Sequence, residues 1–261
     1  MPKIIGHRGA CGSAPENTLA SILRAAELGA RAVEFDATIS RDGHAVVMHD
    51  FNVDRCSDGH GPVILKTLDE IAMLDAGSWF APEFTGERIP LLSDALALVM
   101  EKGMALNLEI KPTLGWEEPT ARVLAATLQD VWPTPAPPPT SPGARLLVSS
   151  MNTLALDVFH ELMPDVTLGL IVYAVPEHWR ARLERHHCLS LHCYHAFVTK
   201  ELVDAVHASG HRIHVYTVNE EAQAEALFAM GVDALFTDHP ERLFALAGTG
   251  AGAGAGAGAE E

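Results

Sequence analysis

Apolar and polar positions along this chain form a repeating pattern that predicts alternating strands and helices. In the second half, apolar residues recur at helical spacing near 153–162, 177–186, 199–208 and 220–229. Short apolar runs of the length of buried strands precede or follow these segments. They lie at Lys3–His7, Met104–Ile110, Arg145–Ser149, Thr167–Val172, Leu189–Cys193, Arg212–Tyr216 and Asp233–Phe236.

One more strand, around Val33–Ala37, completes a set of eight strand ends. These ends are His7, Glu34, Glu109, Ser149, Val172, Cys193, Tyr216 and Phe236. Eight strand–helix units are the number that closes a barrel, and 261 residues suit one such domain. The sequence therefore predicts an α/β fold, a (β/α)8 TIM barrel, with residues 1–247 as a single domain.

Three segments depart from the repeat. Residues 51–94 contain no long periodic element, so we expect a small insertion after the second strand. The run PTPAPPPTSPG at 133–143 cannot form regular structure and predicts a surface loop. The low-complexity Gly/Ala tail at 248–261 has no large apolar side chains to form a core, and we expect it to be disordered.

The stretch Val33–Asp50 is typical of a hairpin with one polar face. Asp42-Gly43 is a strong signal for a two-residue turn, which would place Asp36 opposite His49. Opposed residues share a face, as do residues two apart on a strand, so Glu34, Asp36 and His49 should converge. Such a face could simply be solvated. A hard cation would also explain it, because clustered carboxylates need compensation.

Glu109 strengthens the case for a metal site. Its carboxylate interrupts the otherwise apolar strand LNLEIKP, where an unpaired charge would be costly. Together with Glu34 and Asp36 it would make an oxygen cage suited to one divalent cation, Mg²⁺ or Ca²⁺. Arg8 and Lys111 would place positive charge beside this cage. Alternatively, they could be plain ion-pair partners of the carboxylates.

A cation, an Arg, a Lys and two histidines are suited to the chemistry of a phosphate ester. The positive groups would bind phosphoryl oxygens and stabilise charge as it develops. His7 and His49 could then act as general acid and base, because imidazole titrates near neutral pH. The sequence does not say which histidine has which role.

Composition narrows the possible partners and compartment. The formal charge of −16 argues against nucleic acid and against stable association with a membrane. The four cysteines form no CxxC pair, no secretory signal is visible, and no apolar run is long enough to span a bilayer. We therefore expect a soluble, cytoplasmic protein with reduced cysteines that acts on a small molecule.

Eight short motifs, in order, resemble those of the glycerophosphodiester phosphodiesterase family of the bacterial cytoplasmic type. The resemblance runs from Ile4 to about Leu246. Its motifs are HRGA…APENT (7–18), VEFD (33–36), VVMHD (46–50), LDAGSWF (74–80), RIPLL (88–92), LEIK (108–111), VYTVN (215–219) and FTDHP (236–240). Any one motif is weak, but the ordered set is highly specific.

The resemblance implies a barrel with an insertion after the second strand and hydrolysis of glycerophosphodiesters to glycerol 3-phosphate and an alcohol. A cyclic glycerol phosphate intermediate is the family's proposed route. It implies metal ligands at Glu34, Asp36 and Glu109, and a catalytic pair at His7 and His49. Arg8 and Lys111 would contact the phosphate.

Two residues depart from the family pattern: Tyr216 stands where Trp is usual, and His239 where Tyr is common. The roles of Tyr216, Trp79, His192 and His195 stay open. Two other functions remain as alternatives: a barrel phosphodiesterase acting on lysophospholipids or phosphoinositides, and a catalytically silent phosphate-binding barrel. The first would need an apolar or basic rim around its site.

Overall fold

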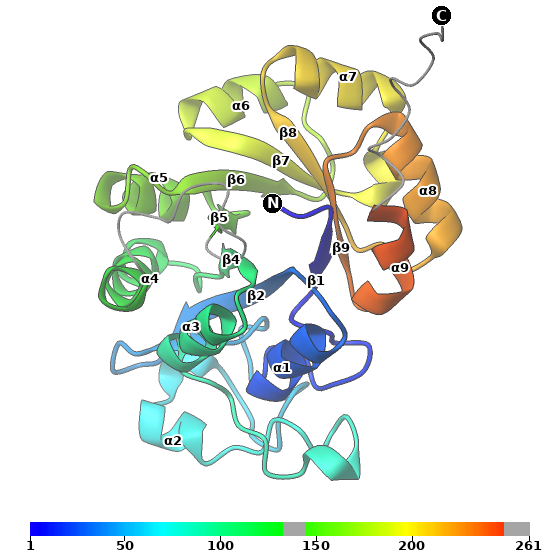
Figure 1. Ribbon diagram of the computed structural model, residues 1–261. Coiled ribbons are helices and arrows are strands. Elements are labelled where there is room, and N and C mark those ends of the chain that lie inside the picture. The colour runs from blue at the N-terminus through cyan, green and yellow to red at the C-terminus, as the bar shows by residue number, and fades with distance from the viewer. Residues whose placement is uncertain (133–144, 248–261) are drawn as a thin grey trace, which may run out of the picture.

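Eight parallel strands close into a barrel, and helices surround it (Figure 1). The computed structural model describes residues 1–132 and 145–247. Around the ring the order is β1, β9, β8, β7, β6, β5, β4, β2, and pairing of β1 with β2 closes it. The strands are β1 (Ile4–Gly6), β2 (Ala32–Ile39), β4 (Ala105–Ile110), β5 (Leu146–Ser150), β6 (Thr167–Val172), β7 (Cys188–Tyr194), β8 (Arg212–Tyr216) and β9 (Ala234–Thr237).

The helices lie on the outside of this ring and confirm the predicted TIM barrel. They are α1 (Leu19–Glu27), α3 (Leu92–Glu101), α4 (Glu117–Val131), α5 (Thr153–Leu162), α6 (Trp179–Arg185), α7 (Lys200–Ala208), α8 (Glu221–Met230) and α9 (Pro240–Ala247). Thr18 caps α1 by accepting a hydrogen bond from the backbone N–H of Ser21 at 3.2 Å. The predicted proline loop and Gly/Ala tail lie outside the described residues.

Strand alternation separates the core from the barrel interior. On β2, Val33, Phe35 and Ala37 pack in the main apolar core together with residues of the surrounding helices. Glu34 and Asp36, between them, therefore point to the other side, into the barrel. β4 repeats the arrangement, with apolar residues in the core and Asn107 and Glu109 between them. The same alternation that builds the core places polar groups inside.

The hairpin after β2 differs from the predicted one. β3 (Ala45–Val47) pairs antiparallel with β2, with Val47 opposite Ala37, so the predicted pairing of Asp36 with His49 is wrong. The backbone N–H of Ser40 donates to the carbonyl of His44 at 2.9 Å, which leaves a three-residue loop rather than a two-residue turn. Gly43 accommodates this loop with φ of 80°. The strand ends at Val47, and His49 lies beyond it.

The segment between β3 and α3 has a small core of its own. It contains the short helix α2 (Leu68–Ala72) and two 3₁₀ turns, Val63–Leu65 and Pro82–Phe84. Buried residues of this core include Val53 and Ile71. Three aromatic residues of the segment pack edge to face on one another, with ring centroids 5.7 Å apart for Trp79–Phe80 and 5.6 Å for Phe80–Phe84. None of them lines the site cavity.

Gly9 allows the loop after β1 to approach α1 closely. Its φ is 88°, and a Cβ atom there would lie 2.4 Å from the hydroxyl of Ser21. A side chain at this position would displace the loop that carries His7 and Arg8. Among the described helices, none is both long and apolar enough to cross a membrane.

Replacing Phe35 with Ala is expected to destabilise the protein without touching the site directly. Phe35 is fully buried on the core side of β2. Its loss should lower the free energy of unfolding by about 3–5 kcal/mol, measured by urea denaturation. Leu114, 89% exposed, provides the control, and Leu114→Ala should change stability by no more than about 0.5 kcal/mol. Equal effects of the two substitutions would contradict this account of the core.

Candidate functional site

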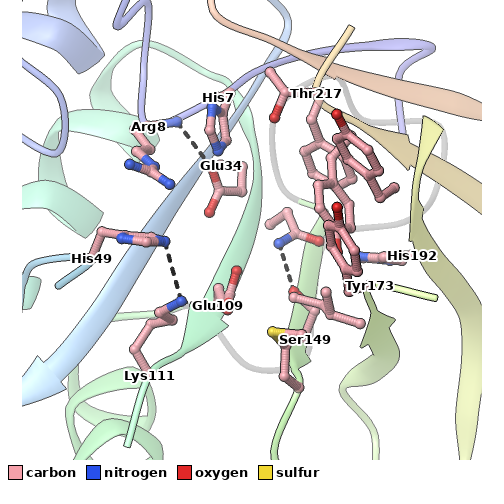
Figure 2. A pocket seen from close by; sticks show the side chains of 16 residues that line it. His7, Arg8, Glu34, His49, Glu109, Lys111, Ser149, Tyr173, His192 and Thr217 are labelled. Carbon is pink, nitrogen blue, oxygen red and sulfur yellow. Dashed lines mark hydrogen bonds and ion pairs between the residues drawn. The ribbon is translucent and has the colours of Figure 1, made fainter. Parts of the chain in front are cut away.

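A cavity of about 290 Å³ opens at the carboxyl ends of the barrel strands (Figure 2). One side carries the cations Arg8 and Lys111 together with His49, and Tyr173 and Thr217 lie across from them. Sixteen residues line the cavity. They are His7, Arg8, Glu34, His49, Asn107, Glu109, Lys111, Ser149, Met151, Ile171, Tyr173, His192, Tyr194, Tyr216, Thr217 and Phe236. Six of the seven predicted site residues are among them, and Asp36 lies directly behind.

Asp36, the seventh predicted site residue, belongs to a cage of three carboxylates. Oxygen atoms of Glu34, Asp36 and Glu109 lie within 4.8 Å of one another. The register of β2 and β4 brings them together, because Asp36 stands beside Glu109 in the sheet. Burial and the neighbouring carboxylates raise the pKa of Glu34 well above its usual value and that of Glu109 to about 7. Both shifts arise because negative charge is crowded into the buried barrel interior.

Hydrogen bonds from the loop after β1 hold two of these carboxylates in place. The backbone N–H of Arg8 donates to Glu34 Oε2 at 2.9 Å. Asn17 donates its Nδ2 to Asp36 Oδ2 at 2.9 Å and accepts from the Asp36 backbone N–H at 3.2 Å. Arg8 and Asn17 both adopt positive φ, so the loop turns sharply enough to present these groups.

Arg8 and Lys111 place positive charge on the cage. Arg8 Nε lies 3.5 Å from Asp36 Oδ2, and Lys111 Nζ lies 3.3 Å from Glu109 Oε1. Burial would raise the pKa of Asp36, but neighbouring charges, with Arg8 first among them, and the hydrogen bond from Asn17 together outweigh burial and hold that pKa below its usual value. Burial likewise opposes the charge of Lys111, yet Glu109 raises its pKa. The ion pairs expected as an alternative are therefore present, in a cavity that still has room for a ligand.

His49 lies at the edge of the cavity between a cation and a carboxylate. Its Nε2 is 3.2 Å from Lys111 Nζ, and its Nδ1 is 2.6 Å from Asp50 Oδ1. Arg55 holds the Asp50 carboxylate through two hydrogen bonds of 2.7 and 3.0 Å. Burial, together with the positive charges of Arg8 and Lys111, lowers the pKa of His49.

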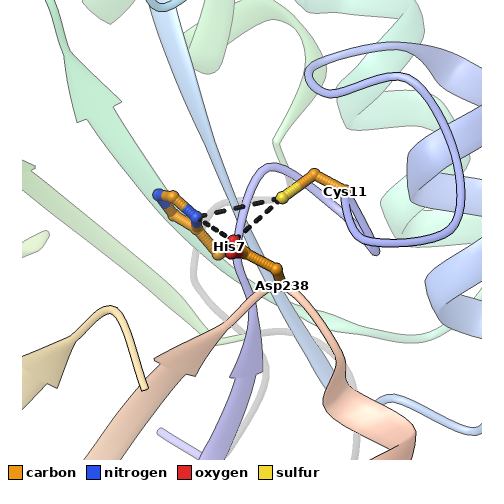
Figure 3. Close-up of side chains that lie close together, drawn as sticks. All are labelled: His7, Cys11 and Asp238. Carbon is orange, nitrogen blue, oxygen red and sulfur yellow. Dashed lines mark hydrogen bonds and ion pairs between the residues drawn. The ribbon is translucent and has the colours of Figure 1, made fainter. Parts of the chain in front are cut away.

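His7 has a carboxylate partner of its own (Figure 3). Its Nδ1 lies 2.7 Å from Asp238 Oδ1, which also accepts a hydrogen bond from the Cys11 thiol at 2.9 Å. Asn219 donates to the other oxygen of Asp238 at 2.7 Å. These bonds keep the pKa of Asp238 well below its usual value, although burial alone would raise it. The Nε2 atom of His7 is thereby left for a ligand in the cavity.

Sequence reasoning did not pair Asp50 and Asp238 with the two histidines. Both stand in matched motifs, directly after His49 and in FTDHP, so a conventional Asp–His pairing was the available signal. It also missed Glu16, which binds Arg8 at 2.7 Å and accepts two hydrogen bonds from Arg55. Two of these contacts, His7–Asp238 and Glu16–Arg55, join residues far apart in sequence, so spacing alone could not reveal them.

The sequence left the roles of four residues open, and the structure shows where each of them lies. Tyr216 and His192 line the cavity, and the Tyr216 hydroxyl donates to the carbonyl of Val172 at 2.9 Å. His192 is buried and pairs with His214 at 3.1 Å, and burial lowers its pKa well below the usual value. His195 and Trp79 are not part of the cavity wall, and His195 bonds to Gln223 instead.

The carboxylate cage fits a hard divalent cation. Its donors are all oxygens, and the raised pKa values of Glu34 and Glu109 indicate that negative charge there lacks full compensation. Beside them, Asn107 is buried and donates to Ser149 at 2.9 Å. Within the described part of the chain, its Oδ1 atom has no hydrogen-bond partner.

Comparison with known proteins agrees with this geometry. The model of the glycerophosphoryl diester phosphodiesterase family matches residues 7–242. A glycerophosphodiester phosphodiesterase of Caldanaerobacter subterraneus is 34% identical over 93% of this chain and 96% of its own. One from Bacillus altitudinis is 33% identical over 93% of this chain and 96% of its own.

Solved structures extend the likeness to three dimensions. A phosphodiesterase of Oleispira antarctica, solved in complex with the product sn-glycerol-3-phosphate, superposes with a TM-score of 0.89. The two chains are 38% identical, and the match covers 94% of this chain and 96% of the other. By sequence over nearly its whole length, and by its fold, this chain belongs to the glycerophosphoryl diester phosphodiesterase family.

Proposed function

We propose that this protein hydrolyses glycerophosphodiesters to glycerol 3-phosphate and an alcohol in a metal-dependent reaction. The observation that carries the proposal is that one cavity brings two fixed cations and two histidines together with a cage of three carboxylates, two of which line it. Membership of the family and the product bound in the Oleispira relative support the same substrate class.

The positive groups of the site would bind the phosphodiester. Glu34, Asp36 and Glu109 would hold one divalent cation, Mg²⁺ or Ca²⁺. When bound, this ion would neutralise the cage and stabilise negative charge on the phosphoryl oxygens. Arg8 and Lys111 lie on the rim of the cage and would contact the non-bridging oxygens. Because both cations are already held by carboxylates, they are oriented before substrate arrives.

The two histidines would move the protons. One histidine would accept the proton of the attacking hydroxyl, which in the cyclic route belongs to the glycerol of the substrate. The other would donate a proton to the oxygen of the departing alcohol. In each ring Nδ1 is engaged by a carboxylate, Asp238 for His7 and Asp50 for His49. That contact orients each imidazole, and Nε2 would exchange the proton with the substrate. Nε2 of His49 meets Lys111 Nζ at 3.2 Å, so it would become available once that ammonium turns to the phosphate.

The proposal includes residues 1–247 as one catalytic domain, with 51–94 as its insertion. Its partner is a small phosphodiester substrate, and a formal charge of −16 disfavours nucleic acid and stable association with a membrane. A cytoplasmic location is also part of it. The four free cysteines of the structure support a reducing compartment.

Chelation of metal should abolish activity. Release of glycerol 3-phosphate from glycerophosphocholine is expected to stop in EDTA and to return on addition of Mg²⁺ or Ca²⁺, because the crowded carboxylates cannot orient substrate without a cation. Inactive protein that regains activity with neither ion would contradict the assignment of these two metals. Undiminished turnover after exhaustive chelation would contradict the metal site itself.

The raised pKa of Glu109 should make the metal-free protein less stable as pH rises. Between pH 4.5 and about pH 7, the Glu109 carboxyl keeps its proton in the folded protein but loses it in the unfolded chain. The free energy of unfolding therefore falls as pH rises through this range. Urea unfolding in EDTA at pH 5 and pH 7.5 should show a larger loss for the unaltered protein than for Glu109→Gln. The difference should be on the order of a few kcal/mol.

Added metal should remove this difference by compensating the charge. Comparison with the Gln variant cancels the opposite effect of the buried histidines, such as His214, whose pKa burial lowers to about 4. The same pH dependence in the unaltered protein and in Glu109→Gln would show that the pKa of Glu109 is not the one that is raised.

Each histidine should be essential for turnover but not for metal binding. His7→Ala and His49→Ala are each expected to reduce kcat by about two to four orders of magnitude, because each removes a proton-transfer group. Calorimetric titration should give nearly unchanged metal affinity for both, whereas Glu109→Ala should weaken it.

A nitrophenyl diester separates the two roles, because nitrophenolate leaves without protonation. The variant that lacks the general acid should regain much of its rate on this substrate, and the variant that lacks the base should not. Near-normal turnover of natural diesters by both variants would be incompatible with acid–base catalysis by this pair.

A further inference from the structure

Three side chains of different chemistry meet beside the cavity, on the Nδ1 side of the His7 ring (Figure 3). Ligand atoms of His7, Cys11 and Asp238 lie within 4.8 Å of one another. His7 follows β1 directly, Asp238 follows β9, and Cys11 lies in the loop between β1 and α1. We call these three residues the second cluster. It lies outside the carboxylate cage and shares only His7 with the cavity wall.

One oxygen of Asp238 accepts from both other members of the second cluster. His7 Nδ1 lies 2.7 Å and Cys11 Sγ 2.9 Å from Asp238 Oδ1, and the sulfur lies 4.0 Å from Nδ1. The need to orient His7 explains the carboxylate but not the sulfur, because a thiol is a weak hydrogen-bond donor and a hydroxyl would serve better. Thiolate sulfur is, however, a strong ligand for a zinc ion.

The spacing of the three atoms nearly matches a tetrahedral zinc site. Zn²⁺ lies about 2.0–2.3 Å from nitrogen, oxygen and sulfur ligands, so two such ligands stand about 3.3–3.6 Å apart. Hydrogen bonds hold two of the three distances in the second cluster below this range, and the distance from sulfur to nitrogen exceeds it. Side-chain shifts of about 0.4–0.6 Å would bring all three distances into range.

Backbone contacts hold together the two segments that carry the second cluster. The N–H of His7 donates to the carbonyl of Thr237 at 2.8 Å. The N–H of Gly12 donates to the carbonyl of Asp238 at 2.9 Å. Asn219 binds the other carboxylate oxygen of Asp238 at 2.7 Å, which orients Oδ1 toward the cluster. All three members are partly exposed, so an ion can reach them from solvent.

We propose that His7, Cys11 and Asp238 form a second metal site, which binds Zn²⁺ with water as the fourth ligand and thereby inhibits the protein. The donor set distinguishes it from the cage, because nitrogen and sulfur favour zinc whereas an all-oxygen cage favours Mg²⁺ or Ca²⁺. Binding of zinc is independent of the proposed function. Its inhibitory effect rests on that function, through the role of His7 in proton transfer.

Zinc would inhibit by fixing the protonation of the His7 ring. In the metal-free protein the Nδ1 proton is donated to Asp238, and Nε2 can exchange a proton with the substrate. When zinc binds, the Cys11 thiol loses its proton to solvent and the Nδ1 proton moves to Nε2, so one ion enters and one proton leaves.

The Nε2 atom of the zinc-bound ring cannot serve catalysis in either direction. It already holds a proton and cannot accept another as a general base. A neutral imidazole is also too weak an acid to protonate a departing alcohol, which requires the imidazolium form. Turnover should therefore fall whichever of the two roles His7 has.

A role for Cys11 as a reactive thiol fits the geometry less well. The nucleophile in thiol chemistry is the thiolate, and the negative carboxylate of Asp238 lies beside the sulfur and disfavours that form. A divalent cation reverses this effect, because its charge stabilises the thiolate and the carboxylate together.

Cobalt provides a test of the site that does not depend on activity. Co²⁺ takes the same ligands as zinc, and its bond to a thiolate gives a charge-transfer band in the near ultraviolet. The cage is first saturated with Mg²⁺, and Co²⁺ is then added. The unaltered protein should show the band, and Zn²⁺ should displace it. Cys11→Ser should lack it. The matched control is Cys188→Ser, which replaces a buried cysteine that donates to the carbonyl of His186, and it should keep the band.

Inhibition is measured as the release of glycerol 3-phosphate from glycerophosphocholine in saturating Mg²⁺. Zn²⁺ is supplied at a buffered free concentration, and each variant is compared with its own rate without zinc. Cys11→Ser should raise the half-inhibiting zinc concentration by about a hundredfold, because it removes a direct ligand. Cys188→Ser should be inhibited as strongly as the unaltered protein. Additional Mg²⁺ should not relieve the inhibition.

The outcomes separate this inference from the proposed function. A missing band in the unaltered protein, or a band that persists in Cys11→Ser, would overturn the site. Inhibition that Mg²⁺ relieves, or that is equal in both variants, would place the inhibiting ion in the cage and overturn inhibition through His7, as would a band without inhibition. A protein that hydrolysed no glycerophosphodiester with metal present would overturn the proposed function and the inhibition with it, while the band would still decide the site.

Discussion

Mutual repulsion among three buried carboxylates is the constraint on which the rest of the site depends. Glu34, Asp36 and Glu109 are brought together by the register of two neighbouring strands, and burial removes the water that would screen them. The surrounding structure compensates only in part. Arg8 stabilises the charge of Asp36, but the pKa values of Glu34 and Glu109 stay raised. The remaining deficit of positive charge makes the cage a site for a cation.

The two histidines resemble each other in geometry but differ in their electrostatic surroundings. Each has a carboxylate on Nδ1. Asp50 is bound by the guanidinium of Arg55, whereas Asp238 is held by the neutral donors Asn219 and Cys11. A positive Lys111 ammonium also faces the His49 ring, which helps to lower its pKa. The barrel therefore offers two imidazoles in unlike fields on the rim of one cage, a useful arrangement for moving protons in opposite directions.

The sequence determined the fold and the position of the carboxylate cage, and the reason for the cage is strand alternation. Apolar residues at every second position must face the helices, so Glu34, Asp36 and Glu109 must face the barrel interior once β2 and β4 form. The repeat of strands and helices likewise determined the fold, because eight such units close a ring. Local turn geometry was harder to predict. The side chain of Ser40 bonds to Asp42 and to the His44 backbone, and the hairpin loop has three residues instead of the predicted two.

Only the tertiary structure decided which side chains surround the histidines. His49 reaches the site from beyond the end of β3, so no strand periodicity governs its direction. Asp238 meets His7 across 231 positions of sequence, because β9 closes the ring against β1. Contacts between distant segments of this kind depend on how the strands are ordered in space, which only barrel closure decides.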